Sequence, residues 1–457
     1  MDVLIIGGGL VGLTLALMLQ SADLNAKVNL KITLIDQKSP EKFLSELGSL
    51  DSQALDTRTL ALSFSSVQIL KSLDSGELWK KLAPVATAIS HLHISEAGTS
   101  SLLRLHAKDY LAKDYGAKEE GEAAFGYVVP IVFLYRALWE TLQKTLAKNL
   151  DQGESHTQNH VEMECPAKVL SVNPELGEVV LDNLDNHKTL KADLILACDG
   201  GNSFVRESLG LKTEVKDYEQ SALVTSVTLS QPHDNWAFER FLSDGVLALL
   251  PLQAGKKGPG LSGLVWVQST QNTEKAMQDS DEDLIEKLQK RFGRRLGDFL
   301  ALGPRHTYPL KKVVAKEVFF GRVLLMGNAA HQLNPIGAQG WNLALRDMFL
   351  LKKLIEKNLN PADLNPADLN LESLHPENWD SSLQLNLFEP YVAATAKDQT
   401  QIERMTDGMA TLYGASDLRS VLTRRSVMAG LKLSACAREE LVLRLMGKKA
   451  YWEICSS

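Results

Sequence analysis

Apolar and polar positions over the first forty residues predict a strand, a helix and a second strand. Residues 3–6 form a short continuous apolar run, residues 10–20 form an apolar run of helical length, and residues 32–35 are apolar again. A glycine-rich turn separates the first strand from the helix. This order predicts a βαβ unit, and therefore an α/β fold at the N-terminus.

Further along, helix-type and strand-type patterns alternate. Helical patterns cover residues 65–82 and 134–150. Strand-type segments are predicted at 167–172, 178–181, 190–197, 222–229, 246–252 and 263–268. The last three favour a separate antiparallel sheet between about residues 215 and 315, and helical segments follow to the C-terminus.

The pattern predicts two interleaved domains, a Rossmann-like α/β domain and a smaller antiparallel-sheet substrate domain. The α/β domain is assigned to residues 1–75, 125–215 and 316–356, and the substrate domain to 76–124 and 216–315. A linker follows at 357–379, where the five-residue unit of NPADLNPADLN repeats, and a C-terminal helical region covers 380–457.

Charge and cysteine content exclude several classes of protein. The 457 residues carry a formal charge of −7, which argues against nucleic acid as a partner. The four cysteines show no CxxC spacing, and no HExxH motif is present, so we expect no metal site and reduced thiols in a cytoplasmic protein. We expect no signal peptide, and the longest apolar run, 125–135, is shorter than the roughly 20 residues of a membrane span.

The first glycine turn fits a dinucleotide-binding fingerprint. Gly7, Gly9 and Gly12 have GxGxxG spacing between a strand and a helix, where they permit a tight turn, close approach of a pyrophosphate and close helix–strand packing. Asp36 lies 24 residues after Gly12, at the end of the second strand, and would accept hydrogen bonds from a ribose. The turn alone does not separate FAD from NAD, so an NAD-dependent dehydrogenase remains an alternative.

Two later segments resemble motifs of single-component flavoprotein aromatic hydroxylases. The first, DGGNSFVR, begins at Asp199 and Gly200 and is similar to the family motif DGxxSxxR. The second, at 321–344, is similar to GDAAH…PxxGxGxN. The resemblance implies a p-hydroxybenzoate-hydroxylase-like fold, and it assigns these residues of the second segment to the FAD site: Asn328, Pro335, Gly337, Gln339, Gly340 and Asn342.

Asn328 departs from the family pattern, in which most members have aspartate. An asparagine keeps hydrogen-bonding capacity but carries no charge. Gly-Asn-Ala-Ala is typical of the ubiquinone-biosynthesis hydroxylases, especially those acting on 2-octaprenyl-6-methoxyphenol. Segments AFERF at 237–241 and DTRTLAL at 56–62 also resemble that subgroup, and the resemblance places Arg58 and Arg136 near the flavin.

The resemblance implies hydroxylation of a polyprenylated phenol with FAD as cofactor, NADH or NADPH as co-substrate, and O2, through a flavin C4a-hydroperoxide. It identifies no catalytic acid or base, and we expect His331 to be a structural hydrogen-bonding residue. Three alternatives stay open: a sister hydroxylase acting at another ring position, a hydroxylase of a small soluble phenol, and a non-catalytic prenyl-lipid-binding scaffold.

The C-terminal region adds a second kind of partner. Residues 419–449 carry eight basic and two acidic residues, interleaved with apolar ones. Such an amphipathic stretch can lie on an anionic membrane surface, or it can dock on protein, including a ubiquinone-biosynthesis complex. We expect peripheral contact with the inner membrane, and the sequence leaves the oligomeric state open.

Overall fold

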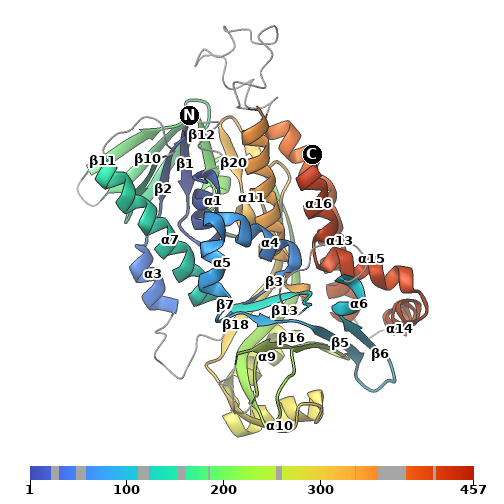
Figure 1. Ribbon diagram of the computed structural model, residues 1–457. Helices are drawn as coiled ribbons and strands as arrows, with labels where there is room; N and C mark the ends of the chain where they lie inside the picture. The colour runs from blue at the N-terminus through green and yellow to red at the C-terminus, as the bar shows by residue number, and fades with distance from the viewer. Residues whose placement is uncertain are drawn as a thin grey trace.

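A computed structural model of the chain describes residues 1–21, 30–47, 58–111, 123–152, 160–183, 186–253, 260–334, 336–358, 387–414 and 418–456. Pro335, the repeat at 360–370 and most of the predicted linker lie outside the described residues. Figure 1 shows a layered α/β body at one end, a large sheet at the other, and C-terminal helices alongside both.

The α/β body is built on a six-stranded sheet in the order β19-β20-β12-β1-β2-β8. Every strand pair is parallel except β19 with β20. The strands are β1 (Asp2–Ile6), β2 (Lys31–Ile35), β8 (His160–Glu164), β12 (Leu194–Ala197), β19 (Phe319–Phe320) and β20 (Val323–Leu325). This sheet contains the predicted βαβ unit.

Both faces of the six-stranded sheet are covered, which explains why its central strands are continuously apolar. Ile5 and Leu196 pack with helices on one face, while Leu4 and Ile195 pack on the other with a three-stranded sheet. The helices are α1 (Leu10–Leu19), α7 (Ile131–Gln152) and α11 (Gln339–Asn358), and the small sheet comprises β9 (Lys168–Asn173), β10 (Glu178–Asn183) and β11 (Asn186–Lys191).

A second, nine-stranded sheet has the order β21-β18-β13-β16-β15-β14-β5-β6, with β17 paired to β13. The predicted antiparallel arrangement needs one correction, because β14 pairs with β5 in parallel. β5 reaches the sheet from an earlier part of the chain, so no hairpin joins these two neighbours. The strands are β5 (His91–Glu96), β6 (Leu102–His106), β13 (Thr213–Leu229), β14 (Trp236–Leu242), β15 (Gly245–Leu252), β16 (Gly260–Ser269), β17 (Phe299–Leu302), β18 (His306–Ala315) and β21 (His331–Gln332).

The two faces of the nine-stranded sheet meet different partners. Helices α9 (Thr270–Gln278) and α10 (Asp281–Phe292) cover the outer face, where Leu284, Leu288 and Phe292 pack on Leu247 and Trp266. The inner face is turned toward the C-terminal helices and the small sheet β3-β7-β4. Those strands are β3 (Thr59–Ser63), β4 (Thr87–Ala88) and β7 (Gly126–Pro130).

Two predicted elements are divided in the structure. The helix predicted over 65–82 is α4 (Phe64–Ser72) and α5 (Glu77–Leu82), separated at Asp74, Ser75 and Gly76, which all have positive φ. The strand predicted over 190–197 is the end of β11 followed by β12. Side-chain periodicity does not detect such breaks, because they depend on backbone conformation.

The C-terminal helices tie the two sheets together. Tyr391 of α13 (Glu389–Gly414) joins the core cluster that contains α11, and Met428 and Val442 pack near β6. The remaining helices are α14 (Leu418–Leu433), α15 (Ala435–Leu445) and α16 (Lys448–Ser456), with short helices α3 (Pro40–Leu47), α6 (Lys108–Leu111) and α8 (Phe204–Ser208) elsewhere. Among the described residues, no helix is both long enough and apolar enough to span a membrane.

The predicted domain boundaries do not follow the ends of elements. β13 begins at Thr213, before the boundary placed at 215, and β21, from the segment assigned to the α/β domain, pairs with β18. The division into two interleaved units stays a prediction.

Candidate cofactor site

The first glycine turn has the steric properties that a dinucleotide-binding turn requires. Gly7 has a φ of 110°, and a Cβ on Gly12 would lie 1.8 Å from the Gly7 carbonyl oxygen, so neither position accommodates a side chain. A Cβ on Gly9, in contrast, would meet no protein atom within 4 Å. Helix α1 begins directly after Gly9 without a side-chain cap, which leaves its N-terminal N–H groups for an anion.

Asp36 lies beside this turn, as the sequence predicted. Its Oδ2 accepts a hydrogen bond from the Gly8 backbone N–H at 2.5 Å, and its Oδ1 accepts one from the Lys38 N–H at 2.7 Å. Tyr135 on α7 donates its hydroxyl hydrogen bond to the Gly8 carbonyl at 3.0 Å. The carboxylate is therefore held in one orientation and keeps further lone pairs for a ribose hydroxyl.

Asp199 and Gly200 follow the end of β12, which is adjacent to β1 in the sheet. The Asp199 Oδ2 accepts the Val205 backbone N–H at 3.0 Å, at the start of α8, while the buried Oδ1 has no partner among the described residues. Gly200 has a φ of 88°, and a Cβ there would meet nothing within 4 Å. A buried acceptor without a partner next to open space is suited to a ligand that donates a hydrogen bond.

Asn328 occupies a third turn, and close contacts of Gly7 and Gly327 with neighbouring residues bring the three turns together. A Cβ on Gly7 would lie 2.5 Å from the Cys198 carbonyl oxygen, and one on Gly327 would lie 2.9 Å from Cγ2 of Val11. The turn at Gly327–Ala329 leaves Asn328 exposed, and its side chain has no hydrogen bond among the described residues. The predicted positions Gly7, Asp199 and Asn328 thus belong to adjacent turns.

Arg206 was not predicted as a site residue, although it belongs to the DGxxSxxR-like segment. Its guanidinium is buried and donates to the Ala329 carbonyl at 2.9 Å and to the Gly201 carbonyl at 2.7 Å. It therefore ties the turn at Gly200 to the turn at Asn328. The available signal was the arginine of the DGxxSxxR-like segment itself, because a buried guanidinium needs carbonyl or carboxylate partners.

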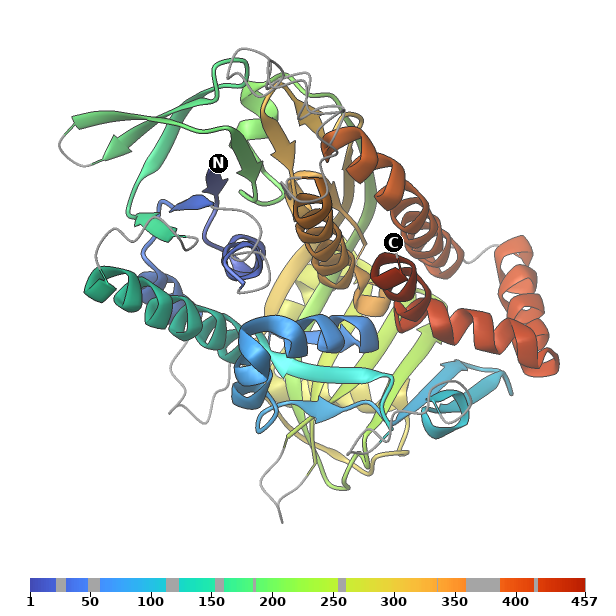
Figure 2. The same cartoon turned by 45° about the horizontal axis from the view of Figure 1, so that its top comes forward.

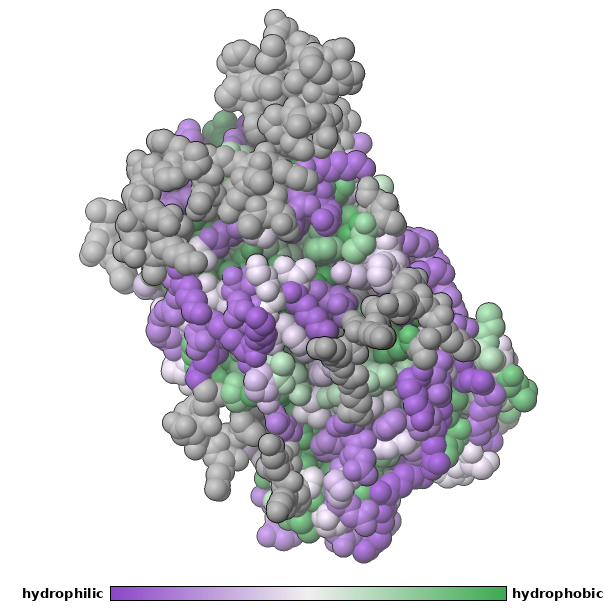
Figure 3. All heavy atoms as spheres, in the orientation of Figure 1, coloured by the Kyte–Doolittle hydropathy of each residue, from purple (hydrophilic) through white to green (hydrophobic). Residues whose placement is uncertain are grey.

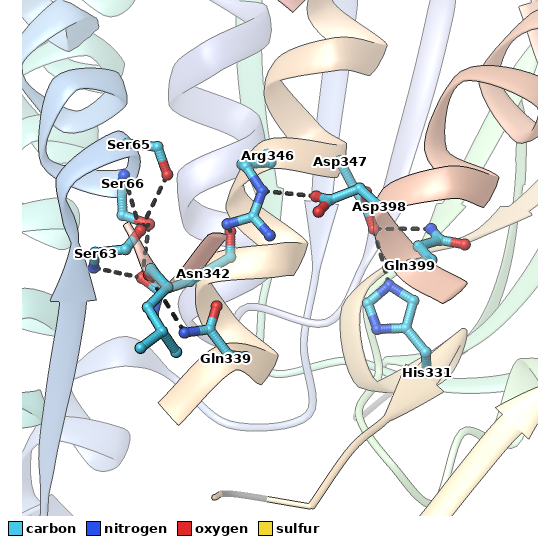
Figure 4. A network of polar contacts seen from close by, with 11 residues as sticks. Ser63, Ser65, Ser66, His331, Gln339, Asn342, Arg346, Asp347, Asp398 and Gln399 are labelled. Carbon is cyan, nitrogen blue, oxygen red and sulfur yellow. Dashed lines mark hydrogen bonds and ion pairs between the residues drawn. The ribbon is translucent and has the colours of Figure 1, made fainter. Parts of the chain in front are cut away.

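Asn342 is a structural clamp at the start of α11. Its Nδ2 donates to the Ala61 and Ala338 carbonyls at 2.9 and 2.7 Å, and its Oδ1 accepts from the Ser63 N–H at 2.9 Å and the Ser66 hydroxyl at 2.6 Å. Figure 4 shows Ser63 and Ser66 beside this amide. These four hydrogen bonds hold the preceding segment in place, and the predicted contact of Asn342 with FAD stays a proposal.

The segment that Asn342 anchors contains Gly337, Gln339 and Gly340. Gly337 has a φ of 72°, and Ala338 has an unfavourable φ of 52°. Gln339 donates to the Gly337 carbonyl at 3.0 Å, and a Cβ on Gly340 would meet nothing within 4 Å. Open space at Gly340 suits the close approach of a flat ring to the backbone.

Two polar contacts of α11 lie behind this segment: an ion pair with α13 and a hydrogen bond with His331 of β21. The Arg346 Nε lies 2.7 Å from Oδ2 of Asp398, and the side chain of Arg346 is 1% exposed. The His331 Nε2 lies 2.8 Å from Oδ2 of Asp347, which also accepts from Gln399 at 3.0 Å (Figure 4). His331 thus has the structural hydrogen bond expected of it.

The positions of Arg58 and Arg136 do not show whether these side chains would contact FAD. The Arg58 carbonyl accepts the Ile131 N–H at 3.0 Å, which places Arg58 at the junction of β3 and α7. Arg136 is half-buried on α7, with no hydrogen bond among the described residues. Their predicted contacts with FAD stay proposals. The described part of the chain contains no group of three or more His, Cys, Asp or Glu side chains that could hold a metal ion.

Taken together, the turns fit FAD. The glycines leave space where the pyrophosphate and ring would pass, Asp36 is oriented for a ribose, and Asp199 and Asn328 offer unused polar atoms. Bound FAD would supply electron transfer and oxygen activation, while the protein supplies position, hydrogen bonds and exclusion of water.

Comparisons with known proteins agree with this assignment. The family model described as FAD binding domain matches residues 131–364. The ubiquinone hydroxylase UbiL of Rhodospirillum rubrum is 30% identical over 350 residues, covering 77% of this chain and 71% of the relative. The 3-demethoxyubiquinol 3-hydroxylase of Escherichia coli is 27% identical over 76% of this chain and 77% of its own.

A solved structure, p-nitrophenol 4-monooxygenase from Pseudomonas putida, has a TM-score of 0.64 at 18% identity and covers 97% of this chain and 98% of its own. This likeness shows the fold. The matched FAD binding domain and the hydroxylase relatives support FAD, and not NAD, as the bound cofactor, which argues against the NAD-dependent dehydrogenase alternative. The chain belongs to the FAD-dependent monooxygenases that serve as ubiquinone-biosynthesis hydroxylases.

Proposed function

We propose that the protein hydroxylates the aromatic ring of a polyprenylated phenol, 2-polyprenyl-6-methoxyphenol, in ubiquinone biosynthesis with NADH or NADPH and O2. The observation that carries the proposal is that three adjacent turns leave open space at Gly9 and Gly200 and an exposed side chain at Asn328. The uncharged Asn328 supports the methoxyphenol subgroup, and the names of the relatives support the pathway.

The alternatives differ in substrate and are separated by the product. A sister hydroxylase would modify another ring position, and a hydroxylase of soluble phenols would not need the prenyl chain. The scaffold alternative is disfavoured, because the chain belongs to a family of hydroxylases and retains the glycines of the flavin site.

The purified protein loaded with FAD is expected to oxidise NADH or NADPH faster when 2-polyprenyl-6-methoxyphenol is present and to yield one hydroxylated isomer. Mass spectrometry and NMR identify the carbon that gains oxygen. Hydroxylation of a polyprenyl phenol at a different carbon would assign the protein to a sister step. Equal turnover of phenols with and without the prenyl chain would contradict the lipid substrate.

We further propose that α14 and the start of α15 contact an anionic membrane surface. Leu422, Val427 and Leu433 on α14 are 53%, 47% and 88% exposed. Arg425 lies among them and is exposed, as is Lys432, whose Nζ donates to the Ser100 carbonyl at 3.2 Å. Figure 3 shows apolar side chains gathered at the edge of the molecule over these helices. Apolar side chains next to basic ones suit the interface of an anionic bilayer.

Some basic side chains of residues 419–449 are buried or hydrogen-bonded within the protein and are not available to a membrane. Arg424 is buried beside Glu96 at 3.5 Å, Lys448 is buried, and Arg438 donates to the Leu431 and Lys432 carbonyls at the end of α14. These three side chains are therefore buried in the protein or hydrogen-bonded to it. The surface open to a bilayer is therefore the opposite face of α14, with Leu422 and Leu433 at its two ends.

Replacing Leu422 and Leu433 with serine is expected to weaken binding to phosphatidylglycerol vesicles at least tenfold, since each leucine buried in the interface contributes about 1.5–3 kcal/mol. Co-sedimentation measures the bound fraction. Leu300→Ser, at an exposed leucine on β17, is the matched control. Binding that survives the double substitution, or that is equal on uncharged vesicles, would favour a protein partner on this surface.

A further inference from the structure

One row of side chains crosses the inner face of the nine-stranded sheet and remains partly accessible. The register of the strands aligns its members. Glu239 of β14 pairs with Ile94 of β5 on one side and with Ala248 of β15 on the other. Ala248 pairs in turn with Val265 of β16, and Val265 pairs with Val224 of β13. The row comprises Ile94, Glu239, Ala248, Val265 and Val224. Every member keeps intermediate exposure.

The neighbouring row on the same face is closed. Phe241, Val246, Val267 and Ala222 are 2–4% exposed and form one apolar cluster with Leu310. The accessible row therefore marks the part of the inner face that protein side chains leave open.

Two contacts place this accessible row close to the flavin segment, which is the segment that contains Gly337, Gln339 and Gly340. Met409 of α13 packs against the closed row, and its Cε would lie 3.8 Å from a Cβ on Gly337. On the opposite side, a Cβ on Gly263 would lie 3.2 Å from Oγ1 of Thr59, at the start of β3. β3 is the strand that Asn342 clamps through Ser63. The row therefore lies between α13, which contacts Gly337, and β3, to which Asn342 anchors the flavin segment.

Glu239 is the one acidic side chain in this row. Its carboxyl has no hydrogen bond or ion pair within the described part of the chain. The other members of the row are aliphatic, so nothing within it balances a charge. A carboxyl held among apolar side chains without a partner is uncommon, because its desolvation is not compensated. Such a group suits a ligand that brings the missing hydrogen-bond donor.

The other titratable groups on this face form no hydrogen bond or ion pair with Glu239 among the described residues. Glu96 pairs with Arg424 of α14 at the end of β5, and Tyr218 donates to Asp407 of α13 at 2.9 Å. His306 on β18 continues the row beyond Val224. Burial, rather than any of these charges, raises the pKa of Glu239 to about 7.

We propose that the Glu239 carboxylate accepts a hydrogen bond from the phenolic hydroxyl of the substrate and holds the aromatic ring between the sheet and the flavin segment. The inference rests on the proposed function and specifies the residue that recognises the phenol. The apolar members of the row, Ile94 and Val265 among them, would contact the faces and edges of the ring. Glu239 is a substrate-binding residue in this account, and no proton transfer is required of it.

The ionisation of Glu239 makes phenol binding depend on pH. A carboxylate is a stronger acceptor than a neutral carboxylic acid. Because burial raises the pKa of Glu239 to about 7, the carboxylate is present above pH 7 and is lost as the pH falls below it. Affinity for a phenol should therefore be highest above pH 7 and should decrease toward pH 6.

The test uses calorimetry to compare the binding of two ligands to the wild type and to variants. The ligands are 2-methoxyphenol, which has the hydroxyl, and 1,2-dimethoxybenzene, which lacks a donor. The proteins, all loaded with FAD, are the wild type, Glu239→Gln and the control Glu274→Gln, whose glutamate is exposed on α9. The wild type and the control are expected to prefer 2-methoxyphenol about tenfold at pH 8.5, as a charge-assisted hydrogen bond provides.

In Glu239→Gln the preference should fall below about threefold, and its dependence on pH should disappear. Glu239→Asp, which keeps a carboxylate, should retain the pH dependence, and FAD content with circular dichroism shows whether each variant is folded. An unchanged, pH-dependent preference in Glu239→Gln would overturn the inference. A wild type that binds 2-methoxyphenol through Glu239 but hydroxylates no polyprenyl phenol would support this inference and refute the proposed function.

Discussion

Replacing Gly9 with valine is expected to give a folded protein that retains no FAD. The backbone at Gly9 has a φ of −72° and a ψ of −171°, which valine adopts readily, and a Cβ there meets no protein atom within 4 Å. The branched side chain would instead occupy the space that the pyrophosphate needs beside the N-terminus of α1. We expect FAD affinity to fall by at least 100-fold, roughly 3 kcal/mol.

Absorbance at 450 nm after gel filtration measures the retained flavin, and circular dichroism measures the fold. Gly430→Val is the matched control, because a Cβ at Gly430, in α14, also meets nothing within 4 Å. Gly12→Ala should fail differently. Its Cβ would lie 1.8 Å from the Gly7 carbonyl oxygen, so stability should fall together with flavin binding. A yellow Gly9→Val protein would contradict the site.

Replacing Asn342 with leucine should destabilise the protein by about 3 kcal/mol or more. The substitution keeps the volume but removes two buried and two partly buried hydrogen bonds, and it leaves the Ala61 and Ala338 carbonyls without the Asn342 amide donor. Each buried polar group left unsatisfied costs about 1–3 kcal/mol. Flavin affinity should also fall, because the segment containing Gly337 and Gly340 loses its anchor.

Urea unfolding with and without added FAD measures both effects. Asn173→Leu is the control, since Asn173 is exposed and accepts one turn hydrogen bond from the Leu176 N–H at 3.2 Å. We expect that control to change stability by less than about 1 kcal/mol. Equal unfolding midpoints for the two variants would show that Asn342 does not clamp β3 to α11.

Local sequence was sufficient for the parallel sheet and for the steric role of the glycine turns. The requirement at Gly7 comes from its own backbone, with a φ of 110°, and that at Gly12 from a carbonyl only five residues away. The spacing of glycines between a strand and a helix expresses both constraints directly. For the same reason Asp36, at the end of β2, could be placed beside the turn.

Long-range contacts were not predictable in the same way. The sequence predicted a contact of Asn342 with the flavin, but not that its Oδ1 accepts hydrogen bonds from Ser63 and Ser66, which lie 279 and 276 residues away in sequence. Arg206 joins two turns through a carbonyl 123 residues distant. No periodicity records which buried side chain will meet which distant backbone group.

The nine-stranded sheet illustrates a second limit. Alternation predicted its central strands, but the parallel pairing of β14 with β5 depends on where an earlier segment docks. The environment of Glu239 depends on that pairing, because Ile94 of β5 is its neighbour in the row. A candidate substrate residue therefore became visible only when strand register was known.

Incorporation of labelled oxygen tests most directly whether this chain is a flavin monooxygenase of polyprenyl phenols. The purified protein, loaded with FAD, is supplied with 2-polyprenyl-6-methoxyphenol and NADH or NADPH under ¹⁸O₂, and mass spectrometry measures the product. We predict that the phenol gains a single oxygen atom and that this atom is ¹⁸O. A product that carries oxygen from water, or oxidation of NADH and NADPH that leaves every phenol unlabelled, would contradict the account.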